Sequence, residues 1–71
     1  MTIGERIKQA RLAAGLTQKE LAKLCGLETR SIGQYEQGIR QPKLHSIAML
    51  AQHLHIPAME LLQLRDEKQR R

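Results

Sequence analysis

Residues 16–38 read LTQKELAKLCGLETRSIGQYEQG, and this stretch decides the fold. Thr17 and Glu20 have the spacing of a capping box, which predicts that a helix begins directly after Thr17. Gly26 supplies a left-handed turn residue, and a second helix from about 28 to 37 ends at Gly38. Two short helices joined by a tight glycine turn form a helix-turn-helix motif. The apolar residues of its first helix, at helical spacing, are Leu21, Leu24 and Cys25.

The second helix of this motif separates its side chains by face. At 100° per residue, one arc of about 140° holds the polar or small residues, whereas Ile32 and Tyr35 point toward a core. The arc contains no acid and no large apolar side chain, and its guanidinium, amide and hydroxyl groups can bond to the edges of bases. This pattern predicts binding to double-stranded DNA. The residues in the arc are Thr29, Arg30, Gly33, Gln34 and Gln37.

Composition agrees with a single small basic domain. The 71 residues include 12 Lys and Arg against 7 Asp and Glu, a net charge of +5. Such an excess favours a polyanion or an anionic membrane as partner. Tyr35 is the only aromatic residue, which argues against single-stranded nucleic acid, since such grooves stack bases on several rings.

The single cysteine, Cys25, cannot form an internal disulfide, and its apolar helix position favours a buried thiol over a redox sensor. No apolar run of about eighteen residues is present, so we expect a soluble cytoplasmic protein with no membrane partner. His45, His53 and His55 lack companion ligands at metal spacing. His45 is a candidate phosphate contact, and the other two decorate a helix end. We expect no metal and no cofactor.

Caps and periodicity predict five helices and an all-α domain. The first helix begins at the Thr2 and Glu5 capping box and stops at Gly15, 39–43 is a loop, and Pro57 opens the last helix. We expect one domain over residues 1–64 and a frayed charged tail over 65–71. The residues expected on inward faces outside the motif are Ile3, Ile7, Ala10, Ala14, Leu44, Ile47, Leu50, Ala51, Leu54, Ala58, Leu61 and Leu62.

With these features, the chain resembles the Cro/repressor-type helix-turn-helix family, also called the XRE family, over about residues 3–64. The resemblance implies a compact five-helix lambda-repressor-like domain whose third helix lies in the major groove. It rests on Ile7, Arg11, Gly15-Leu16-Thr17-Gln18, Glu20-Leu21-Ala22, Gly26, Ser31-Ile32, Tyr35-Glu36, Gly38, Pro42, Leu44 and Leu50-Ala51.

In the third helix, Arg30 can pair with O6 and N7 of guanine, and Gln34 with N6 and N7 of adenine. Thr29 either contacts a base or caps the helix. Gly33 costs up to about 1 kcal/mol relative to alanine. It either lets the helix approach the groove closely or occupies a position under no constraint.

The resemblance also implies contacts outside the base edges. It pairs Arg11 with Glu36 as a structural ion pair, and it places a phosphate contact at Gln18. Two positions depart from the family pattern: Glu28 stands where Ser or Thr usually caps the third helix, and His55 stands where Gly is usual. The residues expected along the DNA backbone are Thr17, Gln18, Lys19, Gln37, Arg40, Gln41 and Lys43.

Dimerisation is expected because the family commonly binds two-fold operators. Ile56, Met59 and Leu64 add apolar area beyond one inward stripe, which suggests a partner helix; the alternative is scattered surface apolar residues.

The function predicted is a DNA-binding transcription regulator, a repressor acting as a homodimer on an inverted repeat. The alternative is an antitoxin-type component that binds a toxin partner, for which only 65–71 lies outside the domain. No catalytic constellation is present, so we do not expect an enzyme.

Overall fold

The computed structural model describes residues 1–69, with side chains as far as Arg65. These residues form the helices α1 (Ile3–Ala13), α2 (Gln18–Cys25), α3 (Thr29–Gln37), α4 (Leu44–Leu54) and α5 (Ala58–Gln69). The predicted all-α class with five helices is confirmed over the described part of the chain. No helix within residues 1–69 is both long and apolar enough to cross a bilayer.

Two helices begin at the capping boxes that the sequence predicts. The Thr2 hydroxyl accepts from the Glu5 backbone N–H at 3.1 Å, and the Glu5 carboxylate accepts from the Thr2 backbone N–H at 2.8 Å. This backbone hydrogen bond lowers the pKa of Glu5 below its ordinary value. Thr17 and Glu20 repeat the arrangement at 3.0 and 2.8 Å. Each box satisfies backbone donors that the first turn of a helix leaves unpaired.

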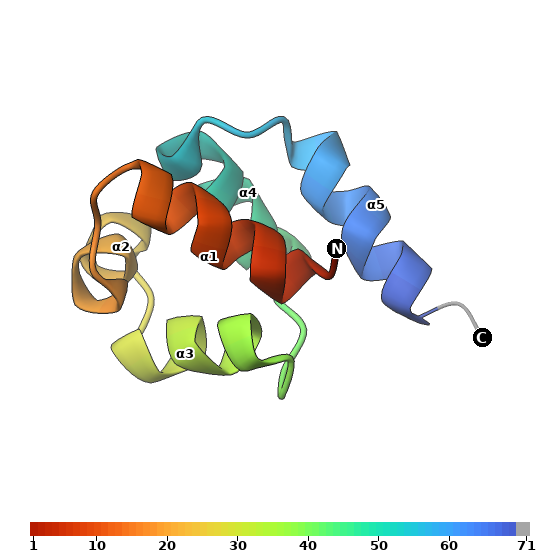
Figure 1. The fold of residues 1–71 in the computed structure, drawn as a ribbon, viewed down its shortest axis with the longest axis horizontal. Coiled ribbons are helices and arrows are strands. Elements are labelled where there is room, and N and C mark those ends of the chain that lie inside the picture. The colour runs from red at the N-terminus through yellow and green to blue at the C-terminus, as the bar shows by residue number, and fades with distance from the viewer. Residues whose placement is uncertain (70–71) are drawn as a thin grey trace.

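The helices enclose one core. α1 packs on α3, α4 and α5, and α2 packs on α3 and α4. In Figure 1, α3 forms the lower edge of the molecule, while α4 and α5 lie toward the top and right. This arrangement leaves the outer face of α3 uncovered. The buried apolar residues are Ile3, Ile7, Ala10, Leu21, Ala22, Cys25, Ile32, Tyr35, Ile47, Leu50, Ala51, Leu54, Ile56 and Leu61.

Several residues expected on inward faces lie outside. Leu44 is 62% exposed, and Ala14 and Ala58 are exposed as well. Leu24, which has helical spacing with Leu21 and Cys25, is 48% exposed. Leu24 points 60° away from Leu21 on the helical wheel, so it misses the seam with α3 and α4. It lines instead a shallow surface hollow of about 480 Å³ with Leu16, Glu20 and Lys23. Leu44 and Ala58 each stand at the first position of a helix, and Ala14 is the C-cap of α1.

Gly4 is a close-approach residue that the sequence analysis missed. A Cβ built on Gly4 would lie 2.2 Å from the backbone oxygen of Tyr35, so α1 and α3 cross here in a contact that only glycine permits. The sequence does carry a signal for this contact. Gly4 lies inside a predicted helix, where glycine costs about 1 kcal/mol relative to alanine, so a glycine there indicates that a close neighbour requires it.

The last helix, α5, runs to Gln69, past residue 64, where we expect the domain to end and the charged tail to begin. Arg65 donates from Nη1 to the Pro42 carbonyl at 3.5 Å and so ties this part of the helix to the loop before α4. Residues 70–71 of the expected tail lie outside the described residues.

Candidate nucleic-acid interface

The two faces of α3 have opposite character. Ile32 and Tyr35 are buried, and the Tyr35 hydroxyl bonds to the Ser46 hydroxyl at 3.3 Å. On the other face Thr29, Arg30 and Gln37 are exposed, and Gln34 and Gly33 are half-buried. Among the described residues, the Arg30 guanidinium makes no hydrogen bond or ion pair, so it is free to bind an external acceptor. The structure thus brings together the stripe that the sequence predicts.

A buried ion pair anchors this helix. Arg11 of α1 donates from Nε to Glu36 Oε2 at 2.7 Å and from Nη2 to Glu36 Oε1 at 3.1 Å. The two side chains are 9% and 3% exposed. The bonded carboxylate raises the pKa of Arg11 above its ordinary value. The pair neutralises an acid that would otherwise repel phosphate beside the exposed face.

Two further bonds extend this pair to the start of α2. Arg11 Nη1 donates to the Leu16 carbonyl at 2.9 Å, and Gln18 Nε2 donates to Glu36 Oε1 at 3.1 Å. No local sequence pattern predicts the bond from Gln18, because it joins side chains eighteen residues apart. One N–H of the Gln18 amide is thereby used, and its second N–H is left for another acceptor.

Gly33 lies against this amide. A Cβ on Gly33 would sit 3.6 Å from Gln18 Oε1, which is ordinary van der Waals contact. Packing therefore does not require glycine here, in contrast to Gly4.

The N-terminus of α3 bears on the capping alternative for Thr29. Glu28 is the N-cap, its carboxylate makes no capping bond, and Thr29 is the first helical residue. The cap interpretation of Thr29 is therefore wrong, and its exposed hydroxyl remains available to a ligand.

The candidate backbone contacts divide by availability. Lys19 and Lys43 are exposed, with Lys43 at the N-cap of α4. Thr17 already uses its hydroxyl as the α2 cap. Gln41 is half-buried with its Oε1 withdrawn from solvent. Lys19 and Lys43 are the cations of this candidate set that make no hydrogen bond or ion pair among the described residues.

Arg40 differs from the other residues of this loop. Its Nη1 lies 3.4 Å from both Ser31 Oγ and Gln34 Oε1, and its Cζ lies 5.7 Å from the centre of the Tyr35 ring. The side chain thus lies along α3, although the residue is exposed.

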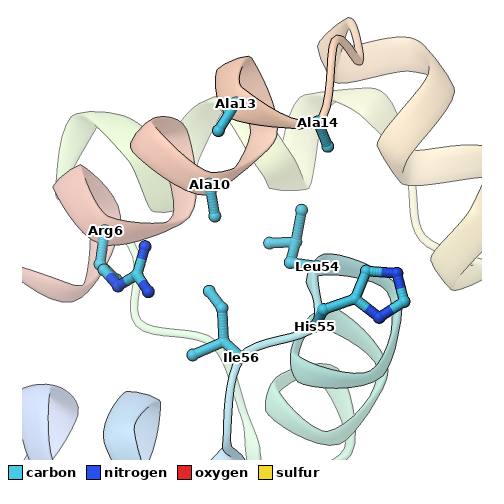
Figure 2. Close-up of a pocket in the computed structure, with 7 residues that line it drawn as sticks. All are labelled: Arg6, Ala10, Ala13, Ala14, Leu54, His55 and Ile56. Carbon is cyan, nitrogen blue, oxygen red and sulfur yellow. The ribbon is translucent and has the colours of Figure 1, made fainter.

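A second hollow lies away from α3. A pocket of about 340 Å³ lies between α1 and the connection from α4 to α5. In Figure 2, Arg6 and Ile56 point into this pocket, and the His55 ring points away from the alanines of α1. Arg6 is bound on the adjoining side by Glu60 of α5, at 2.6 Å. None of the residues that line this pocket belongs to α3.

The three expected dimer residues differ in their exposure. Ile56 is only 5% exposed and belongs to the core, so its place in an interface was wrong: the connection to α5 turns it under α1. Leu64 is half-buried against the core, and Met59 is 62% exposed. Among the described residues, no three His, Cys, Asp or Glu gather as metal ligands.

The geometry defines a class: a helix-turn-helix domain that presents one polar helix outward on a rigid frame. The chain matches the family model HTH_3, described as Helix-turn-helix, over residues 7–61. The HTH-type transcriptional regulator ImmR of Bacillus subtilis (strain 168) is 32% identical over 62 residues, 87% of this chain and 49% of ImmR. The chain spans about half the length of that relative.

Solved structures agree with the family match. The restriction-modification controller protein C.AhdI from Aeromonas hydrophila is 41% identical with a TM-score of 0.78, covering 83% of this chain and 89% of that one. SinR, the master regulator for biofilm formation, solved in complex with DNA, is 27% identical with a TM-score of 0.80, covering 86% and 98%. The N-terminal DNA-binding domain of SinR from Bacillus subtilis has also been solved. A complex of SinR with SinI matches at 26% identity and a TM-score of 0.82, covering 94% of this chain and 66% of that one.

This chain belongs to the helix-turn-helix family of the XRE type, a family of DNA-binding transcription regulators with no catalytic role.

Proposed function

We propose that this chain is a sequence-specific regulator that inserts α3 into the major groove of DNA in the cytoplasm. The observation that carries the proposal is the uncovered polar face of α3, held by the buried pair of Arg11 and Glu36. A recognition helix must keep its orientation to discriminate bases, and a buried bidentate pair supplies that rigidity.

Base reading falls to the free groups on this face. The unbonded guanidinium of Arg30 pairs with O6 and N7 of a guanine, worth about 1–3 kcal/mol of discrimination. The hydroxyl or methyl of Thr29 reaches a neighbouring base. Gly33 adds no side chain between α3 and the groove, and Gln34 is the second base reader.

Contacts with phosphates fix the position of the domain on the duplex. The second side-chain N–H of Gln18 and the backbone N–H groups of Gln18 and Lys19, which the capping box of α2 does not use, face one phosphate, with the Lys19 side chain and Thr17 beside them. Gln37, Gln41 and Lys43 contact the backbone at the other end of α3. Such contacts hold the register without selecting a sequence.

The regulator acts as a homodimer that represses by occupying an inverted repeat. Met59 and the adjoining face of α5 with Leu64 contribute to the dimer surface, since Met59 is a large apolar side chain left in solvent. Pairing two copies doubles the DNA contacts of a small domain.

Single substitutions test the proposal by fluorescence anisotropy on a preferred duplex and on a scrambled one. Arg30→Ala should lose preference at one base pair, whereas Lys43→Ala should weaken both duplexes alike and reduce the salt slope by about 1. Equal effects of both substitutions on both duplexes would contradict the assignment of Arg30 as a base reader.

A second candidate function is control through a protein partner, as in an antitoxin. The observation that favours it is the likeness to SinR solved with SinI. Analytical ultracentrifugation of this chain with a co-expressed partner tests this function: a stable protein complex would support it, and DNA binding alone would produce none.

A further inference from the structure

The connection after α3 folds back onto the helix that it leaves. The backbone N–H of Ile39 donates to the Gln34 carbonyl at 3.0 Å, and that of Arg40 donates to the same carbonyl at 3.3 Å. The backbone of Arg40 is therefore bonded to Gln34, and the guanidinium of Arg40 also contacts the Gln34 side chain.

The guanidinium of Arg40 has three partners on α3. Nη1 lies 3.4 Å from Ser31 Oγ and 3.4 Å from Gln34 Oε1, and Cζ lies 5.7 Å from the Tyr35 ring centre. A cation within about 6 Å of an aromatic centroid is attracted to the ring. Since Ser31 and Tyr35 are buried, two of the three contacts are with side chains held by packing.

This arrangement fixes which end of the Gln34 amide faces outward. A guanidinium has five donors and no acceptor, so the amide oxygen and not the amide nitrogen must lie against it. The Nε2 of Gln34, with its two N–H donors, is then directed away from Arg40.

We propose that Arg40 is a positioning residue. It sets the base preference of Gln34 and is not simply a phosphate contact. The inference rests on the proposed function, because it concerns how this DNA-reading helix selects a base. Reading adenine through N6 and N7 needs both the oxygen and the nitrogen of the amide, whereas the edge of guanine offers two acceptors, N7 and O6. With one lone pair of its oxygen bonded to Arg40 and that oxygen turned toward the arginine, the Gln34 amide directs its two N–H donors outward, and so it prefers guanine over adenine.

Four duplexes that differ only at the base pair read by Gln34 test this inference. The pair is located as the position where Gln34→Ala removes the preference. Binding of wild type, Arg40→Ala and Arg40→Lys is measured on all four by anisotropy. Lys8→Ala, an exposed charge loss on α1, is the matched control.

Wild type should prefer guanine at this pair, and Arg40→Ala should move the guanine-to-adenine ratio toward adenine by about fivefold or more. Arg40→Lys should also change the ratio, because lysine keeps the charge but lacks the planar fork. Arg40→Ala combined with Gln34→Ala should select no differently from Gln34→Ala alone. Lys8→Ala should leave the ratio unchanged.

Two results would overturn the inference and leave the proposed function standing. One is equal weakening of all four duplexes by Arg40→Ala with a smaller salt slope, the behaviour of a phosphate contact. The other is a wild-type preference for adenine that Arg40→Ala does not alter. If wild type shows no preference at any base pair, the proposed function fails and the inference fails with it.

Discussion

Arg11 of α1 and Glu36 of α3 form a bidentate ion pair almost closed to solvent, with Nε to Oε2 at 2.7 Å and Nη2 to Oε1 at 3.1 Å. Through Glu36 the pair also receives Gln18, and through Nη1 it reaches the Leu16 carbonyl. This pair thus connects α1, α2 and α3, and so it holds the outer face of α3 in position.

Breaking this pair should be costly. Arg11→Ala leaves a buried carboxylate without its cation, and we expect it to lower the free energy of unfolding by about 3–5 kcal/mol. Urea unfolding followed by circular dichroism measures the loss. The control is Arg6→Ala, which removes the half-exposed pair with Glu60 and should cost about 1 kcal/mol or less.

Replacing both Arg11 and Glu36 separates the cost of a lone buried charge from the cost of lost side-chain volume. Arg11→Met with Glu36→Met removes the pair without leaving a lone charge, so stability should recover most of what Arg11→Ala loses. A double variant as unstable as Arg11→Ala would show that the other bonds of this network, and not the unpaired charge, carry the cost.

The two glycines inside helices should respond in opposite directions. Gly4→Ala forces a methyl group against the Tyr35 backbone oxygen and should destabilise by about 1–3 kcal/mol or prevent folding. Gly33→Ala meets only the Gln18 side chain and should stabilise by up to about 1 kcal/mol. Thermal unfolding of the two variants tests both, and a Gly4→Ala protein as stable as wild type would contradict the close crossing of α1 and α3.

His55 ends α4 in a left-handed conformation, with φ 58° and ψ 41°, at a position where glycine would be unstrained. His55→Gly should relieve about 1–2 kcal/mol of strain, partly offset by the greater freedom of glycine in the unfolded chain. We expect a net gain of up to about 1 kcal/mol, seen as a higher melting temperature.

Gly26→Ala is the reverse control, because it adds a side chain at a left-handed position. Gly26 has φ 69° and open space around it, so backbone strain is the main effect. It should lose about the amount that His55→Gly gains. A lower melting temperature for His55→Gly would mean that the imidazole makes a contribution larger than the strain.

Cys25 should be protected from thiol reagents and should add a pH dependence at high pH. Burial raises the pKa of its thiol, so the folded protein keeps the proton where the unfolded chain loses it. This contribution to stability is complete below the ordinary cysteine pKa of about 8.5 and is lost as pH rises through the folded pKa. Urea unfolding between pH 7 and 10, compared with Cys25→Ala, should show a steeper decline for wild type; parallel curves would contradict the burial of the thiol.

Local features of this fold could be predicted from sequence because they depend on neighbours along the chain. The capping boxes at Thr2 and Thr17 and the helix-ending glycine at Gly26 each need only a few adjacent residues. The polar face of α3 follows from helical periodicity alone.

Tertiary relationships were missed because periodicity does not say which neighbour covers a residue. Ile56 looked like spare apolar surface, yet it completes the core beneath α1. Leu24 has helical spacing with Leu21 and Cys25, yet it is 48% exposed. The bonds of Gln18 to Glu36 and of Arg40 to Gln34 depend on where whole side chains meet after folding.

The central claim is that α3 reads sequence in duplex DNA, and the most direct measurement is selection of random duplexes by the purified protein at near-physiological salt. Sequencing of the bound fraction should return an inverted repeat with half-sites about one helical turn apart, each containing the guanine contacted by Arg30. Binding without enrichment that vanishes as salt rises would contradict the claim, since it would reduce the interaction to attraction between a basic surface and phosphate.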